Sequence, residues 1–291
     1  MFRSGFRGLN RRWKWMFAVI GLLYFLPLLS NVLLLFMPTE NLSTYFKEKG
    51  IAVSEHHITK PQGQIHYYKL GGDTGQWVLW VHGSPGSAAD VREQAAISVS
   101  QGFRVLLLDR PGYGGSALSE SALLTNQAQA LIDILQEEVS GQQCILAAHS
   151  YGGAVVLRAA SLKPNRVKGL LLVSPTLDPD LERNNGFKRF LQAYGLSWPI
   201  RWMLPHELLQ SAREMALLPS EMEKTMPDLE QVRCPIAEIH GTNDALAPFG
   251  NQAFVRKHLR FARRYFLTYK DGDHFIVWKY PEAVQAMLKK L

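Results

Sequence analysis

Short apolar runs alternate with longer, more polar stretches over most of the chain beyond residue 50. Five of the apolar runs have the length of buried strands and cover residues 77–82, 103–109, 144–149, 167–174 and 236–241. Stretches of helical character separate successive runs. Buried strands separated by helices are typical of a parallel sheet with helices on both faces. The pattern therefore predicts an α/β fold.

Weaker patterns complete the predicted core. Two strand-like stretches, 51–58 and 64–70, flank Pro61-Gln62-Gly63 and predict a hairpin. A last strand is expected at residues 265–270. Helices are expected at residues 88–100, 121–139, 152–162, 250–262 and 281–290. These elements place the α/β core in residues 38–175 and 233–291.

Residues 176–232 interrupt this alternation. The segment is helical in tendency and rich in aromatic side chains, among them Phe190, Tyr194 and Trp198. We predict a helical cap above the carboxyl ends of the strands, where binding sites form in open α/β sheets. These three aromatic residues are therefore candidate substrate-binding residues. Packing of the same side chains on the core is the structural alternative.

The N-terminal region carries a long uncharged segment at residues 15–37. As a helix it spans about 34 Å, which exceeds the roughly 30 Å of a hydrocarbon core. Residues 1–14 form a basic tail without acidic residues, and such a tail stays in the cytoplasm. We therefore expect a single-pass signal anchor, a transmembrane helix that leaves the α/β domain outside the cytoplasm, which in a Gram-negative bacterium would be the periplasm. Signal cleavage followed by secretion is the alternative.

Composition excludes several classes of partner. The tail contains Arg3, Arg7, Arg11, Arg12 and Lys14, which supply most of the net charge of +7. The rest of the chain is close to neutral, so we expect no nucleic-acid partner. Both cysteines adjoin apolar runs and are expected to be free, buried thiols. Without a Cys–His cluster, a dinucleotide-binding glycine turn or a phosphate loop, neither a metal nor an organic cofactor is expected.

One serine stands where a buried strand is expected to end and a helix to begin. Ser150 follows the apolar run 144–149 and precedes Gly152. In a strand–turn–helix of this kind the serine adopts a strained conformation that exposes its Oγ above the sheet. Small residues at Ala148 and Gly152 give the turn room. The N–H of Tyr151, at the start of the helix, would point toward an anion beside the serine.

Five short motifs, placed after successive strands, resemble those of the α/β-hydrolase superfamily over about residues 50–291. They are HGSPG at 82–86, DRPGYGGS at 109–116, AHSYGG at 148–153, HGTND at 240–244 and DGDHF at 271–275. The one departure is Ala148, where the family usually has glycine. The resemblance implies an α/β-hydrolase fold with a serine nucleophile. A serine at this turn argues against the epoxide-hydrolase and dehalogenase branches, which use aspartate.

The resemblance also implies roles for individual residues. Ser150 would be the nucleophile, His274 its general base and Asp244 the acid that orients His274, in the chain order expected for this fold. Two other acids, Asp178 and Asp180, are alternatives for the third position. The oxyanion hole would consist of the backbone N–H groups of Ser84 and Tyr151. His82 and Gly83, in the first motif, are candidate substrate contacts, with a purely structural role as the alternative for His82.

These expectations combine into a membrane-anchored serine hydrolase without a cofactor. Its expected substrate is a small-molecule or lipid-like carboxylic ester with an apolar acyl group, cleaved through an acyl-enzyme. An aminopeptidase acting on N-terminal proline is an alternative that needs an acidic cluster in the cap to bind a free amine. Hydrolysis of amides, thioesters or carbon–carbon bonds, and a non-catalytic binding module, are further alternatives. Candidate acids for such a cluster are Glu182, Glu207, Glu214, Glu221 and Glu223.

Overall fold

The computed structural model of the chain describes residues 41–198 and 200–291, and nine positions between residues 11 and 29. The predicted basic tail (1–14) and signal anchor (15–37) fall largely outside these residues, so both stay predictions. Among the residues that the structure describes, no helix has both the length and the apolar character needed to cross a bilayer.

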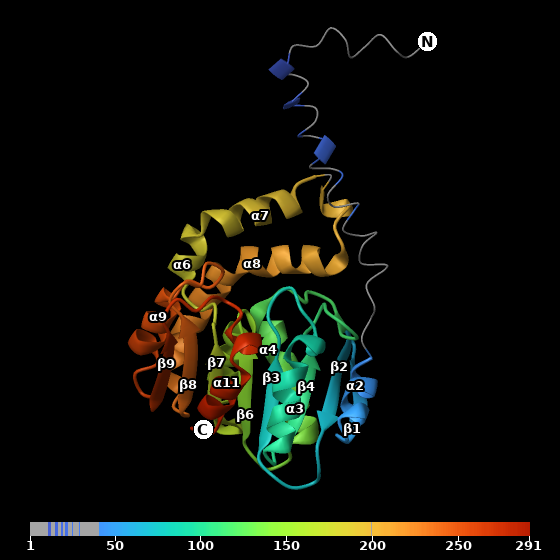
Figure 1. Cartoon of the computed structure of the whole chain (residues 1–291), viewed down its shortest axis with the longest axis vertical. Helices are drawn as coiled ribbons and strands as arrows, with labels where there is room; N and C mark the ends of the chain where they lie inside the picture. The colour runs from blue at the N-terminus through green and yellow to red at the C-terminus, as the bar shows by residue number, and fades with distance from the viewer. Residues whose placement is uncertain are drawn as a thin grey trace.

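A mixed sheet of nine strands forms the centre of the described part of the chain (Figure 1). Its order is β1-β2-β4-β3-β6-β7-β8-β9, and the short β5 pairs with β2. The strands β3, β4 and β6 to β9 run parallel, whereas β2 is antiparallel to both β1 and β4. The strands are Val53–Lys60 (β1), Gly63–Leu70 (β2), Trp77–Val81 (β3), Arg104–Asp109 (β4), Ala117–Leu118 (β5), Cys144–His149 (β6), Val167–Val173 (β7), Ile236–Gly241 (β8) and Arg264–Tyr269 (β9). The predicted α/β-hydrolase fold is confirmed.

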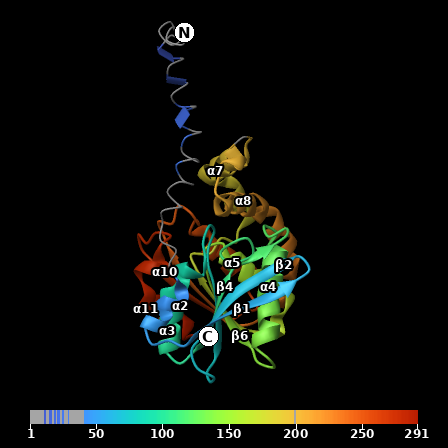
Figure 2. The ribbon, with the colours of Figure 1, turned by 90° about the vertical axis from the view of Figure 1, so that its right-hand side faces the viewer.

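Helices cover both faces of this sheet, as Figure 2 shows edge-on. One face carries α2 (Leu42–Glu48), α3 (Arg92–Ser100), α10 (Ile276–Lys279) and α11 (Pro281–Leu288). The other carries α4 (Leu124–Glu138), α5 (Gly152–Leu162) and α9 (Gly250–His258). Strand β3 shows why both faces are apolar, because alternate side chains of a strand point to opposite faces of the sheet. Trp77, Leu79 and Val81 pack on the face covered by α4, α5 and α9. Val78 and Trp80 pack on the face covered by α2, α3, α10 and α11. Helix α2 and strand β5 were not predicted from the sequence.

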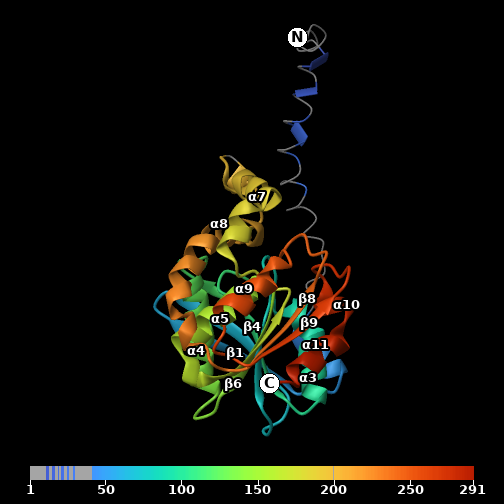
Figure 3. The same ribbon diagram turned by 90° about the vertical axis from the view of Figure 1, so that its left-hand side faces the viewer.

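A helical segment connects β7 to β8 and lies above the carboxyl ends of the parallel strands (Figures 1 and 3). It occupies the region expected to form a cap. Its helices α7 and α8 pack against each other, and the short helix η4 packs on α5 of the core. The elements are α6 (Pro179–Asn184), α7 (Gly186–Leu196), η3 (Ile200–Trp202), α8 (His206–Thr225) and η4 (Met226–Gln231).

Candidate active site

Ser150 occupies a strained turn between β6 and α5. Its φ is +55°, a left-handed conformation that costs a non-glycine residue about 1–2 kcal/mol. Hydrogen bonds hold the turn in place: the N–H of Ser150 donates to the carbonyl of Val173 (3.0 Å), and the N–H of Gly153 donates to the carbonyl of Ser150 (2.9 Å). The strain is therefore maintained by the surrounding backbone, and it holds the serine side chain above the sheet.

Glycines allow the backbone on either side of Ser150 to come close to the end of β3. A Cβ at Gly152 would lie 2.7 Å from the carbonyl oxygen of His82, a backbone atom that cannot easily move. A Cβ at Gly83 would lie 3.1 Å from the Cβ of Ser150. The start of α5 and the loop after β3 are thus in direct contact. This places the residues with the predicted oxyanion donors, Ser84 and Tyr151, on the two sides of Ser150.

The structure brings the three predicted catalytic side chains together. The hydroxyl of Ser150 lies 3.0 Å from Nε2 of His274, and Nδ1 of His274 lies 2.8 Å from Oδ2 of Asp244. The residues come from the loops after β6, β8 and β9. The last two loops are joined by the N–H of Asn243, which donates to the carbonyl of Gly272 (2.9 Å). The arrangement is that of a nucleophile, a base and an acid that orients the base.

The carboxylate of Asp244 is held in its charged form. Burial alone would favour the neutral acid, but hydrogen bonds to His240 and His274 outweigh it and lower the pKa of Asp244 well below its usual range. Its other oxygen accepts the N–H groups of Leu246 (2.9 Å) and Ala247 (2.7 Å). A fixed negative charge at this position can stabilise a positively charged His274.

A second buried histidine supports the loop that carries His274. The ring of His149 donates from Nε2 to the carbonyl of His274 (3.1 Å). Burial, followed by the charge of His274, lowers the pKa of His149 to about 3, so this ring stays neutral. A neutral ring beside His274 supports its backbone and adds no competing charge.

The two alternative acids do not reach the triad histidine. Asp178 caps helix α6 by accepting the N–H of Asp180 (2.9 Å). The side chain of Asp180 is 84% exposed and lies near Arg183. Since Nδ1 of His274 is bonded to Asp244, the geometry favours Asp244 as its partner.

A pocket of about 390 Å³ lies between the cap and the core and opens onto Ser150 and His274. This volume is within the range of small-molecule sites. Most of the lining is apolar and comes from α7 and α8. The lining residues are Ser84, Pro85, Ser150, Thr176, Lys188, Leu191, Gln192, Tyr194, Gly195, Leu204, Leu208, Ser211, Ala212, Met215, Leu246 and His274.

Of the three aromatic residues predicted to bind substrate, the structure places only Tyr194 at this pocket. Phe190 and Trp198 lie outside it and are 61% and 76% exposed, so the structure does not place these two predicted residues at the pocket. The geometry of α7 explains why Phe190 does not face the pocket. Phe190 follows the pocket residue Lys188 by two positions, and two positions correspond to a rotation of about 200° around an α-helix. Trp198 lies beyond the end of α7. Aromatic content indicated the cap, but it did not indicate which side chains point inward.

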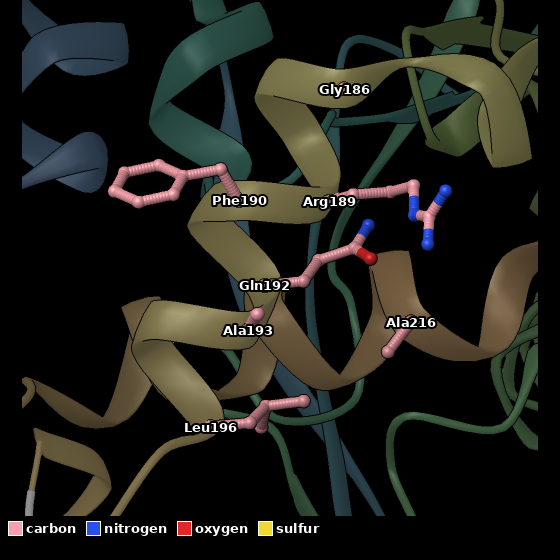
Figure 4. Close-up of a pocket in the computed structure, with 7 residues that line it drawn as sticks. All are labelled: Gly186, Arg189, Phe190, Gln192, Ala193, Leu196 and Ala216. Atoms are coloured by element: carbon pink, nitrogen blue, oxygen red, sulfur yellow. The ribbon is translucent and has the colours of Figure 1, made fainter.

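Phe190 instead borders a second hollow of about 510 Å³ on the outside of the cap. Figure 4 shows this hollow along α7, with Ala216 contributed by α8. Arg189 and Gln192 extend to one side of α7, and Phe190 extends to the other. No residue of the predicted triad lines this hollow, so we place the candidate active site in the pocket above Ser150.

His82 is a structural residue rather than a pocket residue. It is fully buried, its Nδ1 donates to the carbonyl of Gly83 (2.8 Å), and its Nε2 accepts the N–H of Arg110 (3.0 Å). Burial, followed by the charge of Arg110, lowers the pKa of His82 to about 3. Gly83 lies beside Ser150 but does not line the pocket. The structure therefore does not place these two predicted residues at the pocket: both shape the loop that carries Ser84.

Sequence reasoning missed the residues that join this loop to the cap. Arg110, after β4, and Glu214, in α8, are both fully buried and form an ion pair with an Nη1–Oε1 distance of 2.9 Å. Glu214 also accepts the hydroxyl of Ser84 at 2.6 Å. The sequence pointed to Glu214 only as one of five candidate acids in the cap, and it did not point to Arg110. Its partner could not be read from the sequence because 104 residues separate the two.

One group of described side chains has the chemistry of metal ligands. Glu55, His57 and His66 place potential ligand atoms within 4.8 Å of one another. Both ring nitrogens of His66 are engaged, with Glu55 (2.8 Å) and with Asp109 (2.7 Å). Asp109 also accepts the N–H of Gly115 (3.1 Å). His66 therefore links the β1–β2 hairpin to the glycine turn after β4, and we assign no metal to this group.

Comparison with known proteins identifies the family of the chain. The alpha/beta hydrolase family matches residues 78–286. A non-heme chloroperoxidase of Streptomyces lividans is 26% identical over 265 residues, which cover 78% of this chain and 95% of that protein. Pimeloyl-[acyl-carrier protein] methyl ester esterase of Nitrosomonas europaea is 27% identical over 220 residues, which cover 64% of this chain and 83% of that protein.

Solved structures with low sequence identity share the fold. An esterase of Thermogutta terrifontis aligns with a TM-score of 0.62 at 22% identity, over 81% of this chain and 97% of that one. A putative lipase of Acinetobacter baumannii aligns with a TM-score of 0.63 at 17% identity, over 88% and 97% of the two chains. Since the family match covers most of the sequence, the chain belongs to the alpha/beta hydrolase family.

Proposed function

We propose that the protein is a serine hydrolase that cleaves carboxylic esters with apolar acyl groups. The observation that carries this proposal is the chain of hydrogen bonds from Ser150 to His274 to Asp244 at the base of a largely apolar pocket. A serine hydroxyl becomes an effective nucleophile only when a base takes its proton, and His274 is within 3.0 Å.

The reaction proceeds in two steps. Ser150 Oγ attacks the ester carbonyl carbon while His274 takes its proton, and the N–H groups of Ser84 and Tyr151 stabilise the oxyanion that forms. The tetrahedral intermediate collapses, and His274 gives the proton to the departing alcohol. Water then attacks the acyl-enzyme with His274 as base, which releases the acid and restores Ser150. Asp244 stabilises His274 each time it becomes charged.

The charges around the pocket favour a neutral substrate over a free amine. Its lining includes no Asp or Glu among the residues that the structure describes. Lys188 is the lining residue with a permanent charge, and its Nζ is paired with Glu182 at 2.7 Å. The other buried acids of the cap are paired as well, Glu214 with Arg110 and Glu221 with Lys224. An N-terminal amine in this pocket would have no free carboxylate partner, so the prolyl aminopeptidase alternative is disfavoured.

The relatives and the N-terminal segment support two further parts of the proposal. One relative is named a methyl ester esterase, which agrees with an ester substrate. The uncharged segment 15–37 and the basic tail before it support a membrane anchor with the hydrolase domain outside the cytoplasm. Protease added to intact spheroplasts should then digest the domain. Digestion only after lysis would contradict this topology.

Active-site labelling tests the proposed chemistry directly. The wild-type protein should react with a fluorophosphonate probe, and Ser150→Ala should not. A folded wild-type protein that fails to react would refute the serine hydrolase proposal. A series of p-nitrophenyl esters of increasing chain length, assayed beside prolyl amides, then tests the substrate class. Faster cleavage of the prolyl amides would overturn the preference for esters.

A further inference from the structure

The buried ion pair of Arg110 and Glu214 is the centre of a hydrogen-bond network. This network joins the cap to the loop after β3 that carries Gly83 and Ser84, which we call the oxyanion loop. Two guanidinium nitrogens of Arg110 donate to the two carboxylate oxygens of Glu214, at 2.9 and 3.2 Å. Glu214 also accepts from Gln127 (2.7 Å), Tyr113 (2.9 Å) and Ser84 (2.6 Å). Buried ion pairs are stable only when further hydrogen bonds satisfy both partners. Here one of those bonds comes from Ser84, which lines the same pocket as Ser150.

Arg110 also fixes one peptide group of the oxyanion loop. Its Nη2 donates to the carbonyl of Gly83 at 2.7 Å, and its Nε donates to the carbonyl of His82 at 3.1 Å. The Gly83 carbonyl receives a second bond from the His82 ring at 2.8 Å. The Gly83–Ser84 peptide is trans, so the N–H of Ser84 points away from that carbonyl. Two donors that hold the Gly83 carbonyl therefore also set the direction of the Ser84 N–H.

The side chain of Ser84 is held by the same network. Its hydroxyl donates to Glu214, and it lies 3.0 Å from the hydroxyls of Tyr113 and Ser211. These bonds occupy the hydroxyl of Ser84, while the residue still lines the pocket beside Ser150. Arg110 thus fixes the carbonyl of Gly83, and Glu214 fixes the side chain of Ser84.

We propose that Arg110 and Glu214 are positioning residues that orient the Ser84 N–H toward the oxyanion, and that the cap helix α8 thereby contributes to catalysis. This inference rests on the proposed function. Oxyanion donors stabilise the transition state only when they are already aimed at the developing charge. A cationic donor on the Gly83 carbonyl also polarises the peptide, which makes the Ser84 N–H a stronger donor. Glu214 keeps that cation in place because it neutralises Arg110 inside the protein.

The test compares two glutamates on the same helix. Glu214→Gln preserves side-chain shape but removes the charge that holds Arg110 and Ser84. Glu221→Gln is the matched control, since Glu221 is also buried in α8 but pairs with Lys224. With the best p-nitrophenyl ester, Glu214→Gln should lower kcat about 100-fold and change KM less than about threefold. Glu221→Gln should retain wild-type kcat.

Affinity for a trifluoromethyl ketone separates positioning from a general loss of structure. This compound forms a tetrahedral adduct with the serine, so its affinity should fall in Glu214→Gln by about the same factor as kcat/KM. If Glu214→Gln does not fold, Ser84→Ala replaces it, because this variant keeps the backbone N–H and loses only the hydroxyl, with its bonds to Glu214, Tyr113 and Ser211. A folded variant with wild-type kcat and ketone affinity would overturn the proposal.

A structural measurement keeps this test independent of the proposed function. In a crystal structure of Glu214→Gln, or of Ser84→Ala if that variant is used, the Gly83–Ser84 peptide should be rotated from its wild-type orientation. In Glu221→Gln it should not. An unchanged peptide orientation would refute the positioning proposal, whatever the result of the fluorophosphonate test. A wild-type protein that fails to react with fluorophosphonate would refute only the hydrolase proposal.

Discussion

A buried histidine below the triad should make the stability of the protein depend on pH. His240 is fully buried in β8, with Nδ1 3.2 Å from Glu238 and Nε2 3.5 Å from Asp244. Burial alone would lower its pKa, but the hydrogen bonds to Asp244 and Glu238 outweigh burial and raise the pKa of His240 to about 9. At neutral pH the folded protein therefore holds a proton on a ring that the unfolded chain leaves mostly neutral.

The direction of the effect follows from linkage between protonation and folding. A group whose pKa is raised by folding stabilises the folded state fully at pH values below its unfolded pKa, here about 6.5. That stabilisation is lost as the pH rises through the folded value of about 9. The difference between the two pKa values corresponds to about 3 kcal/mol of unfolding free energy.

Urea unfolding at pH 6 and pH 9.5, with the full chain in mild detergent, measures this loss. His240→Gln is the test variant, because glutamine stays neutral and can still donate to the carbonyl of Ala247, which His240 contacts at 2.8 Å. Groups remote from His240 titrate in both proteins, so their contributions cancel in the comparison. Between pH 6 and pH 9.5 the unfolding free energy of the wild-type protein should fall by about 3 kcal/mol more than that of the variant.

A second buried histidine provides the control. The pKa of His149 is about 3, since burial and the charge of His274 both lower it, and its ring stays neutral over the whole range. Between pH 6 and pH 9.5, His149→Gln should therefore lose the same unfolding free energy as the wild-type protein, within about 1 kcal/mol. If His240→Gln and the wild-type protein lost the same amount of stability, the proton would not reside on His240, and the argument from the two carboxylates would be wrong.

The nucleophile, its partners and the pocket give three more expectations. Ser150→Gly should be about 1 kcal/mol more stable to urea than Ser150→Ala, because glycine adopts a φ of +55° without strain; equal stabilities would contradict the strained turn. Asp244→Asn should lower kcat about 10⁴-fold in steady-state assays, because the amide no longer stabilises a charged His274, and a wild-type kcat would refute that role. Ala212→Trp should fill the pocket and shift the preferred p-nitrophenyl ester to shorter acyl chains, and an unchanged chain-length profile would place the acyl group elsewhere.

The core could be predicted because its signals are local. The run Cys144–His149 is apolar at nearly every position, and the helix Gly152–Leu162 follows after a turn of two residues. The predicted catalytic residues come shortly after the ends of strands, and the carboxyl ends of parallel strands meet at one edge of the sheet. Ser150, Asp244 and His274 could therefore be expected to lie close together, although Ser150 and His274 are 124 residues apart.

The pocket could not be predicted in the same way, because it depends on how α7 is rotated about its axis. The segment 176–232 contains enough aromatic residues to suggest a lining, but Phe190 and Trp198 face solvent. Smaller residues such as Gly195 and Ala212 line the pocket instead. The orientation of a helix is set by packing against its neighbour, here between α7 and α8, and composition carries no information about it.

The partners of Asp109 and Glu214 could not be predicted, whereas the partner of Asp244 could, and these partners decide what each acid of the site does. Asp109 is bonded to His66 and to the backbone of the glycine turn, so it organises a loop. Asp244 is bonded to His274, so in the proposed mechanism it serves the base. Glu214 is bonded to Arg110 and Ser84, so in the proposed mechanism it serves the loop after β3. Because a buried carboxylate without partners would be neutral or would unfold the protein, its bonds define its role more strictly than its position in a motif. An acid in the cap, outside every motif, is for this reason tied directly to Ser84, a residue that lines the pocket beside Ser150.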